Sequence, residues 1–253
     1  MKKMILKTAL LACVAIAGNA QALPVAGQGT WETTLVGRDI NGNAVAGNAA
    51  SSVFLYDTVL DVTWLRDANA NGAMKWSDAN TWAADLVVGA YDDWRLPTLT
   101  PVNGTAFNIN FTNNGTSDNG YGATGTGWGT ASEMGHLFYV TLGNTGYCTP
   151  DEDESNGCEE QPGSGLTNTG DFQNLQESFY WSGLEYAPLT SHAWNFNTSV
   201  GGQNGYYKTD SMYALAVRPG DVLVPAVPEP ETYALMLAGL AVVGAAARRR
   251  KAK

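Results

Sequence analysis

Histidine is almost absent from this chain of 253 residues, which has only His136 and His192. Two histidines are too few for a histidine-rich transition-metal site. The sequence also lacks a Gly-x-Ser-x-Gly nucleophile elbow and a glycine-rich phosphate-binding loop. Carboxylates are plentiful, but no spacing among them marks an acid–base pair for glycoside hydrolysis. We therefore expect that the protein is not an enzyme.

Basic residues are scarce between the two ends of the chain. Residues 23–227 hold six basic and 22 acidic side chains, a net charge of −16. The six are Arg38, Arg66, Lys75, Arg95, Lys208 and Arg218. A charge of this sign repels nucleic acid and anionic lipid, so we expect no nucleic-acid partner. Sulfated glycans would be repelled as well, unless a local basic patch or a bridging Ca²⁺ intervened.

Cysteine is scarce too, and Cys13 lies in an apolar run at the N-terminus. The other two, Cys148 and Cys158, stand nine residues apart in a loop rich in Gly, Asp and Glu. In an oxidising compartment such a pair is more plausibly a structural disulfide than a redox site, worth roughly 2–3 kcal/mol in the chain-entropy model. That bond would leave no free thiol for catalysis.

Long apolar runs occur only at the two ends. Lys2, Lys3 and Lys7 flank the run 4–17, which is too short for a permanent span, and Ala20-Gln21-Ala22 supplies small residues before a cleavage point. We predict a signal peptide over residues 1–22 and a mature N-terminus near Leu23.

The C-terminus carries a second targeting signal, after the signal peptide. Pro228-Glu229-Pro230 precedes 16 apolar or small residues, 232–247, and the cationic cluster 248–253 follows. The prolines interrupt regular structure, the apolar helix can enter the inner membrane, and the cations stay in the cytoplasm. This order, over residues 225–253, resembles the PEP-CTERM sorting signal, which implies processing by an exosortase-type protease. An ordinary anchor is the alternative, although 16 residues is short for a span.

Between the signal peptide and the sorting segment we expect one domain, residues 23–224, of class α+β. Alternating apolar residues predict strands early and late in the domain, and helical periodicity predicts two helices between them, 77–88 with Ser77 as N-cap and 132–142 ended by Gly143. First and last strands could pair. The predicted strands cover 30–36, 52–56, 60–65, 179–182, 193–197, 206–208 and 213–218. Residues 101–130, dense in Gly, Asn and Thr, predict a mobile surface insertion.

A second resemblance covers residues 53–219. The motifs Trp76-Ser77-Asp78-Ala79, Trp94-Arg95-Leu96-Pro97-Thr98, Ser132-Glu133-Met134-Gly135-His136-Leu137, Tyr180-Trp181-Ser182, Trp194-Asn195-Phe196 and Val217-Arg218-Pro219 occur in this order. Their order resembles the Lcl C-terminal domain family. The resemblance implies a C-type-lectin-like fold, with a mixed or antiparallel sheet and two helices.

Several aromatic residues and one arginine are candidates for a binding role. Trp181, Trp194 and Tyr206 suit a sugar-binding platform, although residues of this kind more often belong to a core. Arg95 needs acceptors, and Asp92, Asp93 or backbone carbonyls are the candidates.

The loop 67–72 is the candidate cation site. Asp67, Asn69 and Asn71 place oxygens at positions 1, 3 and 5 of a Ca²⁺-binding pattern, with Gly72 at position 6. Ala73 offers a carbonyl at position 7, and Asp78 stands at position 12. The alternative is an Asx turn that feeds the following helix.

Two functions are compatible with these features. The first is an exported surface protein whose C-type-lectin-like domain binds extracellular polysaccharide, with the candidate Ca²⁺ site as an aid. The second is a structural protein of the cell envelope or biofilm matrix without a specific pocket. In both, the chain is tethered to the inner membrane before processing and then reaches the envelope or extracellular matrix.

Overall fold

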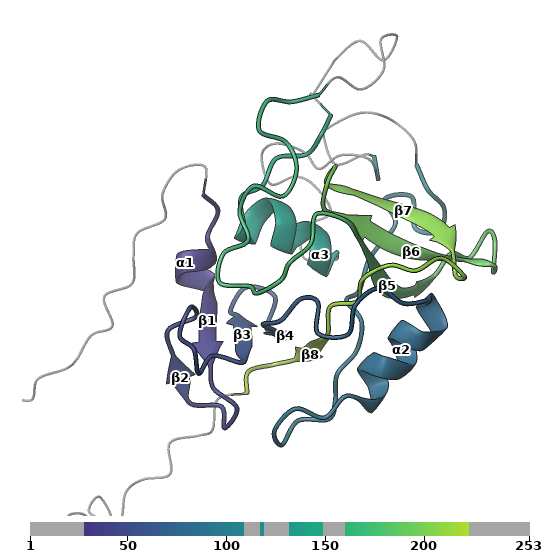
Figure 1. Ribbon diagram of the computed structural model, residues 1–253. Helices are drawn as coiled ribbons and strands as arrows, with labels where there is room; N and C mark the ends of the chain where they lie inside the picture. The colour runs from purple at the N-terminus through teal and green to yellow at the C-terminus, as the bar shows by residue number, and fades with distance from the viewer. Residues whose placement is uncertain (1–27, 109–116, 119–131, 149–159, 223–253) are drawn as a thin grey trace, which may run out of the picture.

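A computed structural model describes residues 28–108, 117–118, 132–148 and 160–222, and shows two antiparallel sheets joined by short helices (Figure 1). The first sheet has the order β2-β1-β3-β4-β8, with β1 (Leu35–Arg38), β2 (Ala44–Val45), β3 (Phe54–Asp57), β4 (Val62–Leu65) and β8 (Val217–Pro219). The second has the order β5-β6-β7, with β5 (Phe179–Glu185), β6 (His192–Asn197) and β7 (Gly202–Tyr207). The α+β class is confirmed, and the C-type-lectin-like arrangement stays a prediction.

The first predicted helix is present but shifted. Helix α2 runs over Trp76–Asp85 and begins one residue before Ser77. The hydroxyl of Ser77 contacts Asp78 instead of capping the helix, so the predicted N-cap is wrong. Leu86 is already extended, and Gly89 (φ +64°) lies in the turn between Val88 and Tyr91 rather than at the helix end.

The second predicted helix is one α-turn followed by one π-turn. Helix α3 covers Glu133–His136, and η2 covers Leu137–Thr141. Gly143 does end the helical segment, with φ +67°. A Cβ at Gly143 would lie 2.2 Å from the backbone nitrogen of Gly29, so this glycine permits the close approach of the first described residues.

The N-terminal strand prediction is largely wrong. Residues 30–36 were expected to be extended, but Trp31–Thr34 form the helical turn α1, and β1 starts only at Leu35. The hydroxyls of Thr33 and Thr34 both donate to the carbonyl of Thr30. Local hydrogen bonds of this kind compete with strand formation, and the alternation of residues does not reveal them.

The last strand does join the early sheet, though not through the first strand. β8 pairs antiparallel with β4, with Thr63 opposite Arg218, whereas β1 lies between β2 and β3. The backbone of Arg95 also pairs with Val217, which brings the central segment of the chain against β8.

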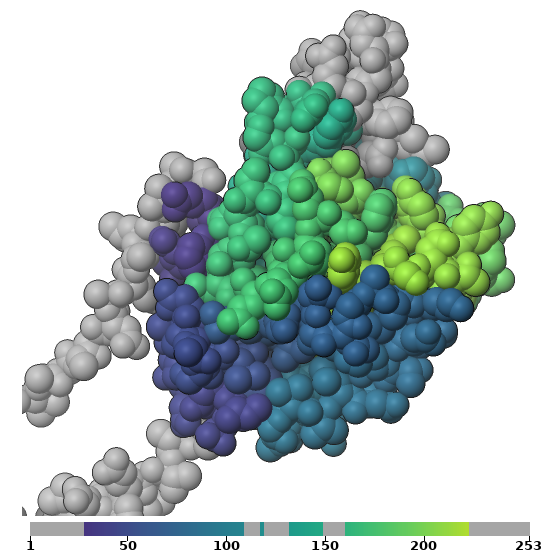
Figure 2. Space-filling model, viewed as in Figure 1, coloured from purple at the N-terminus to yellow at the C-terminus, as the bar shows by residue number. Residues whose placement is uncertain are grey.

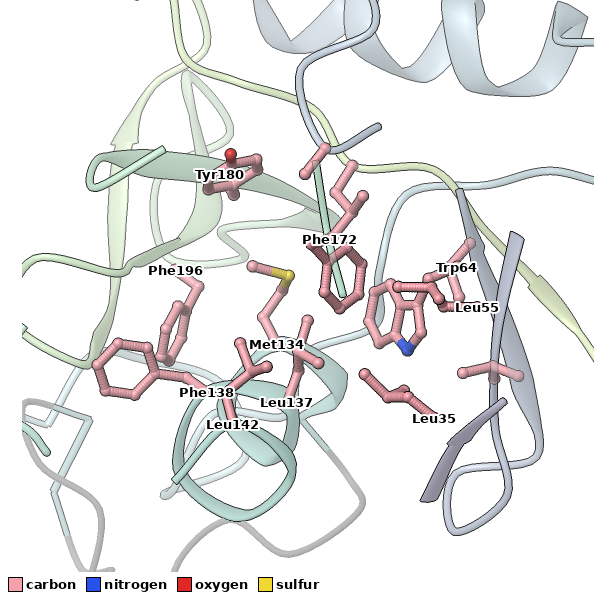
Figure 3. Close-up of a cluster of buried hydrophobic side chains, with 14 residues drawn as sticks. Leu35, Leu55, Trp64, Met134, Leu137, Phe138, Leu142, Phe172, Tyr180 and Phe196 are labelled. Carbon is pink, nitrogen blue, oxygen red and sulfur yellow. The ribbon is translucent and has the colours of Figure 1, made fainter. Parts of the chain in front are cut away.

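The main core lies between the two sheets, and Figure 3 shows its side chains converging. Trp64 and Leu55 come from the first sheet, Phe196 and Tyr180 from the second, and Phe138 from η2. All five are essentially inaccessible to solvent. Burial of such large side chains contributes most of the stabilisation, at about 25 cal/mol per Å² of apolar surface.

The second sheet is covered on both faces. Tyr180 and Phe196 belong to the cluster that contains α3 and η2, whereas Trp181 and Ala193 pack with Ala79 and its neighbour Ala83 on α2. Because both faces of this sheet are covered, its exposed ligand-accessible surface is confined to the strand ends and the hairpin beyond Glu185.

Several predictions fall outside the described residues, namely the signal peptide, the sorting segment with its apolar helix, Cys158 and most of the insertion 101–130. Within the insertion, Ser117 and Asp118 are completely buried, so a wholly surface position is wrong for these two residues. In the part of the chain that the structure describes, no helix is long and apolar enough to cross a membrane.

Candidate ligand-binding surface

The two tryptophans predicted to bind ligand are core residues. Trp181 and Trp194 have exposed fractions of 0%, and the indole of Trp181 donates to the carbonyl of Met74 at 2.9 Å. Tyr206 is half-buried and packs edge-on against Phe179 at 5.1 Å between ring centroids. Neither face of either tryptophan is accessible to a ligand. The prediction that they form a sugar-binding platform is therefore wrong, and the alternative, that they belong to the core, is favoured.

A different set of aromatic rings reaches the surface at the end of the second sheet. Tyr186 packs edge-on against Trp194 at 5.3 Å, His192 lies 6.2 Å from Tyr186, and Tyr207 lies over His192 at 4.1 Å. The side chain of Tyr207 is 58% exposed. We call Tyr186, His192 and Tyr207 the aromatic row, which leads from the buried Trp194 to solvent.

Strand register and one glycine build the aromatic row. His192 on β6 stands directly opposite Tyr207 on β7, which stacks the two rings. The backbone N–H of Tyr186 donates to the carbonyl of His192, so the chain turns back immediately after β5. Gly205 lies opposite Trp194, and a Cβ at this glycine would come within 3.0 Å of the Tyr186 ring. Glycine therefore leaves the space that the Tyr186 ring fills.

Polar and apolar groups surround the aromatic row. Glu185 forms an ion pair with Lys208, whose ammonium group lies 4.5 Å from the centroid of the Trp76 ring. Leu189, in the hairpin, is 55% exposed. Exposed aromatic faces beside hydrogen-bonding groups suit ligands that have both apolar C–H faces and hydroxyl groups.

Arg95 finds one of the predicted kinds of acceptor, a backbone carbonyl, but its main partner is Glu133, which was not predicted. Its guanidinium pairs with both carboxylate oxygens of Glu133 at 2.7 and 2.8 Å and also donates to the carbonyl of Leu96. The hydrogen bonds to Glu133, helped by its charge, raise the pKa of Arg95. Asp93 instead pairs with Arg218 at 2.6 Å, so the assignment of Asp93 to Arg95 is wrong.

A surface pocket of about 370 Å³ lies beside Arg95. Its walls come from α2, from the segment 94–99 and from the end of β5. The lining residues are Asn80, Ala84, Trp94, Arg95, Leu96, Pro97, Thr98, Leu99, Gly183 and Leu184. A pocket of this volume falls within the range of about 300–1,000 Å³ that small-molecule sites occupy.

The predicted calcium loop folds as an Asx turn, with the N–H of Asn69 donating to Asp67 Oδ1 at 3.0 Å. Asn174 donates to the same oxygen, and Asn69 Oδ1 is buried without a hydrogen-bond partner among the described residues. Asn71, Ala73 and Asp78 are exposed, and Asp78 lies in the first turn of α2. Two of the five predicted ligands, Asp67 and Asn69, thus lie together and carry side-chain oxygens that Ca²⁺ can bind. Ca²⁺ binding stays a prediction.

Among the described residues, no group of three or more His, Cys, Asp or Glu side chains is arranged to hold a metal ion. His136 is buried, its Nε2 has no hydrogen-bond partner within the described residues, and burial lowers its pKa. Cys148 is buried, and its pairing with Cys158 stays a prediction.

Sequence reasoning missed the aromatic row for a physical reason. It chose aromatic residues inside strands, where alternation places every second side chain in the core, and passed over Tyr186 and His192 at the turn. Binding residues are often found in turns that a rigid scaffold positions. The short spacing between Tyr186 and His192 around a Pro-containing turn was the available signal.

Comparison with known proteins identifies the C-terminal segment. Residues 226–251 match the family model of the PEP-CTERM protein-sorting motif, which confirms the sorting segment and includes Pro228, Glu229 and Pro230. The resemblance of residues 53–219 to the Lcl C-terminal domain finds no support in the comparisons. No curated protein matches the chain. The motif supports an exported protein that is anchored in the membrane before an exosortase-type enzyme processes it.

Proposed function

We propose that this exported, exosortase-sorted chain is a non-enzymatic recognition protein of the cell envelope or extracellular matrix, whose folded domain binds neutral polysaccharide. The aromatic row carries the proposal. An aromatic surface that reaches solvent suits ligand binding, because leaving apolar surface in water is unfavourable and a bound ligand would cover it. Tyr207 is 58% exposed, whereas its neighbour Tyr206 on β7 is half-buried.

The chemistry of the row favours sugars. The C–H faces of a pyranose ring pack against the flat faces of Tyr207 and His192, as apolar groups pack on aromatic rings elsewhere in proteins. The hydroxyl of Ser191, which lies 2.9 Å from His192 Nδ1, can exchange hydrogen bonds with sugar hydroxyls. Tyrosine suits such a site because its ring packs against apolar groups while its hydroxyl stays in water.

Charge narrows the class of polysaccharide. The domain carries a net charge of −16, and four of its six basic side chains form ion pairs. Lys208, the basic residue that follows Tyr207, is already paired with Glu185, which reduces its attraction for a uronate or sulfate group. A polymer with many negative charges would be repelled. The ligand is therefore a neutral polysaccharide.

A structural matrix role is the second candidate. It would need no pocket and no exposed aromatic residues, since display and bulk charge would suffice. The sorting motif is compatible with both functions, because it directs the chain outward without specifying a ligand.

Retention on immobilised polysaccharides separates the two functions. The mature protein, recovered from expressing cells, is passed over neutral matrices such as mannan, dextran and galactomannan and over anionic alginate. We expect retention on at least one neutral matrix and none on alginate. Tyr207→Ala should lose this retention, whereas Val87→Ala, which removes an exposed apolar side chain from another part of the surface, should keep it. Absence of retention on every neutral matrix would favour the structural role.

A further inference from the structure

Two turns with exposed apolar side chains lie beside the point where the chain leaves the domain for the sorting segment. We infer that these turns are the surface against which the membrane-bound processing enzyme docks. Residues 39–43 form the turn between β1 and β2, and residues 87–91 form the turn that follows α2. We call these two turns the exit face. The inference does not depend on polysaccharide binding, because it starts from the sorting motif, which implies an exosortase-type enzyme.

Val222, the last residue of the domain that the structure describes, is held between the two turns. The hydroxyl of Tyr91 donates to the carbonyl of Val222 at 2.8 Å, and a Cβ at Gly42 would lie 1.9 Å from the same oxygen. Glycine, here with φ +83°, permits this approach. The side chain of Val222 is only 2% exposed. The chain therefore leaves the domain at the exit face, from a fixed position.

The two turns also contact each other. A Cβ at Gly89 would lie 2.6 Å from the carbonyl oxygen of Ile40. Figure 2 agrees with this contact, since the purple surface near β2 meets the blue surface beyond α2. Asp39 Oδ1 accepts the backbone N–H of Asn43, which closes the first turn and leaves Ile40 at its tip. The side chains of Ile40 and Val87 are 40% and 67% exposed, so the exit face presents apolar surface.

The sorting motif cannot lie far from the exit face. Pro228 is six residues beyond Val222, and six residues span at most about 22 Å when fully extended. The apolar run starts at Thr232, ten residues beyond Val222, which places the domain within about 36 Å of the start of that run. These limits follow from covalent geometry and hold for every conformation of the segment.

The processing enzyme has to work inside this interval. A folded domain of 100 residues has a radius of gyration of about 13 Å, and a sphere with that radius of gyration is about 34 Å across. An enzyme of even this size that encloses Pro228-Glu229-Pro230 fills the space between the membrane and the domain. Its surface therefore meets the exit face while it acts on the motif.

Charge favours a protein partner over a lipid surface. Asp39 lies in the first turn, and Asp92 follows the second turn and is exposed. Arg38 precedes the first turn and Arg218 lies over the Tyr91 ring, but each arginine is paired with an aspartate. The exit face is therefore net negative, and anionic lipid headgroups would be repelled. The partner that fits is a protein surface with apolar residues and basic groups around them.

Photo-crosslinking of the full chain tests which partner covers the exit face. The photoreactive residue p-benzoylphenylalanine replaces Val87, or Leu189 as the control, which is 55% exposed in the hairpin of the second sheet. The cells co-express an epitope-tagged exosortase-type enzyme that processes the wild-type chain. We expect crosslinks to the tagged enzyme from position 87 and none from position 189. Crosslinks from position 87 to lipid alone, or none to the enzyme, would overturn the inference.

The rate of processing gives a second readout, measured by pulse-chase labelling in the same cells. The double variant Ile40→Asn, Val87→Asn should be processed at least threefold more slowly than the wild type, and Leu189→Asn at the wild-type rate. Ten Gly and Ser residues inserted after Val222 remove the distance limit. With this insert, the double variant and the wild-type domain should be processed at equal rates. An unchanged rate in the double variant, or the same slowing with and without the insert, would show that the enzyme does not use the exit face.

Discussion

Arg95 and Glu133 are joined by two charge-assisted hydrogen bonds, of 2.7 Å from Nη2 and 2.8 Å from Nη1. The carboxylate also accepts the backbone N–H of Thr98 at 2.6 Å. Glu133 is only 7% exposed, whereas the arginine side chain is 36% exposed, so the acid depends on the arginine for compensation. This pair fixes α3 against the segment that forms the floor of the pocket.

Replacing the arginine should therefore destabilise the domain. Arg95→Met leaves Glu133 charged, buried and bonded only to the backbone of Thr98. We expect a loss of about 2–4 kcal/mol in the free energy of unfolding, measured by urea denaturation. Asp93→Asn is the control, because this carboxylate is 46% exposed and the asparagine keeps an oxygen that can accept from Arg218, with an expected loss below about 1 kcal/mol. Equal losses in the two variants would contradict this account of the pair.

Close backbone contact at Gly143 gives a second prediction. A Cβ there would lie 2.2 Å from the nitrogen of Gly29, whereas a Cβ at Gly104, which also has positive φ, meets nothing within 4 Å. Gly143→Ala should cost at least about 2 kcal/mol more than Gly104→Ala, because both carry the strain of positive φ and only one adds a clash. Equal thermal stability of the two variants would show that residues near Gly29 do not dock as described.

Asp118 should make stability depend on pH in the acid range. Its carboxylate accepts hydrogen bonds from Val102, Asn108 and Gln203, yet burial raises its pKa. A raised pKa means that the folded state binds the proton more tightly than the unfolded chain. The contribution of Asp118 to the free energy of unfolding therefore falls as pH rises through the interval between its ordinary and its raised pKa.

Denaturation of the wild type and Asp118→Asn across about pH 3 to 7 checks this sign. The stability of the wild type relative to the variant should decrease as pH rises. Burial also raises the pKa of Asp171, but that residue is present in both proteins and cancels in the difference. A difference that grows with pH would mean that the three donors outweigh burial at Asp118.

Calcium gives a prediction that is independent of sugar binding. Asp67 and the buried oxygen of Asn69, which has no hydrogen-bond partner in the described part of the chain, offer two ligands in one turn. Millimolar Ca²⁺ should raise the melting temperature by about 2–4 °C, as expected when a ligand binds only the folded state. Asp67→Asn should abolish the shift and Asp85→Asn, exposed on α2, should keep it. No shift in the wild type would leave the Asx turn as the whole role of this loop.

Features set by residues close together in the sequence could be predicted, and features set by contacts between distant residues could not. The position of α2 and the late strands followed from local periodicity, and the sorting segment followed from the order of three short elements. The partner of Arg95 could not be predicted from the sequence, because Glu133 is 38 residues away and acidic residues closer in the chain were available. The aromatic row was missed for a similar reason, since it is set by the register of His192 opposite Tyr207.

The measurement that tests the central claim most directly is calorimetric titration of the mature protein with the neutral polysaccharides mannan, dextran and galactomannan. The account predicts saturable binding of at least one of them by the wild type, and at least tenfold weaker binding of it by Tyr207→Ala with an unchanged melting temperature. Equal affinity of the two proteins, or no saturable binding by the wild type, would contradict it.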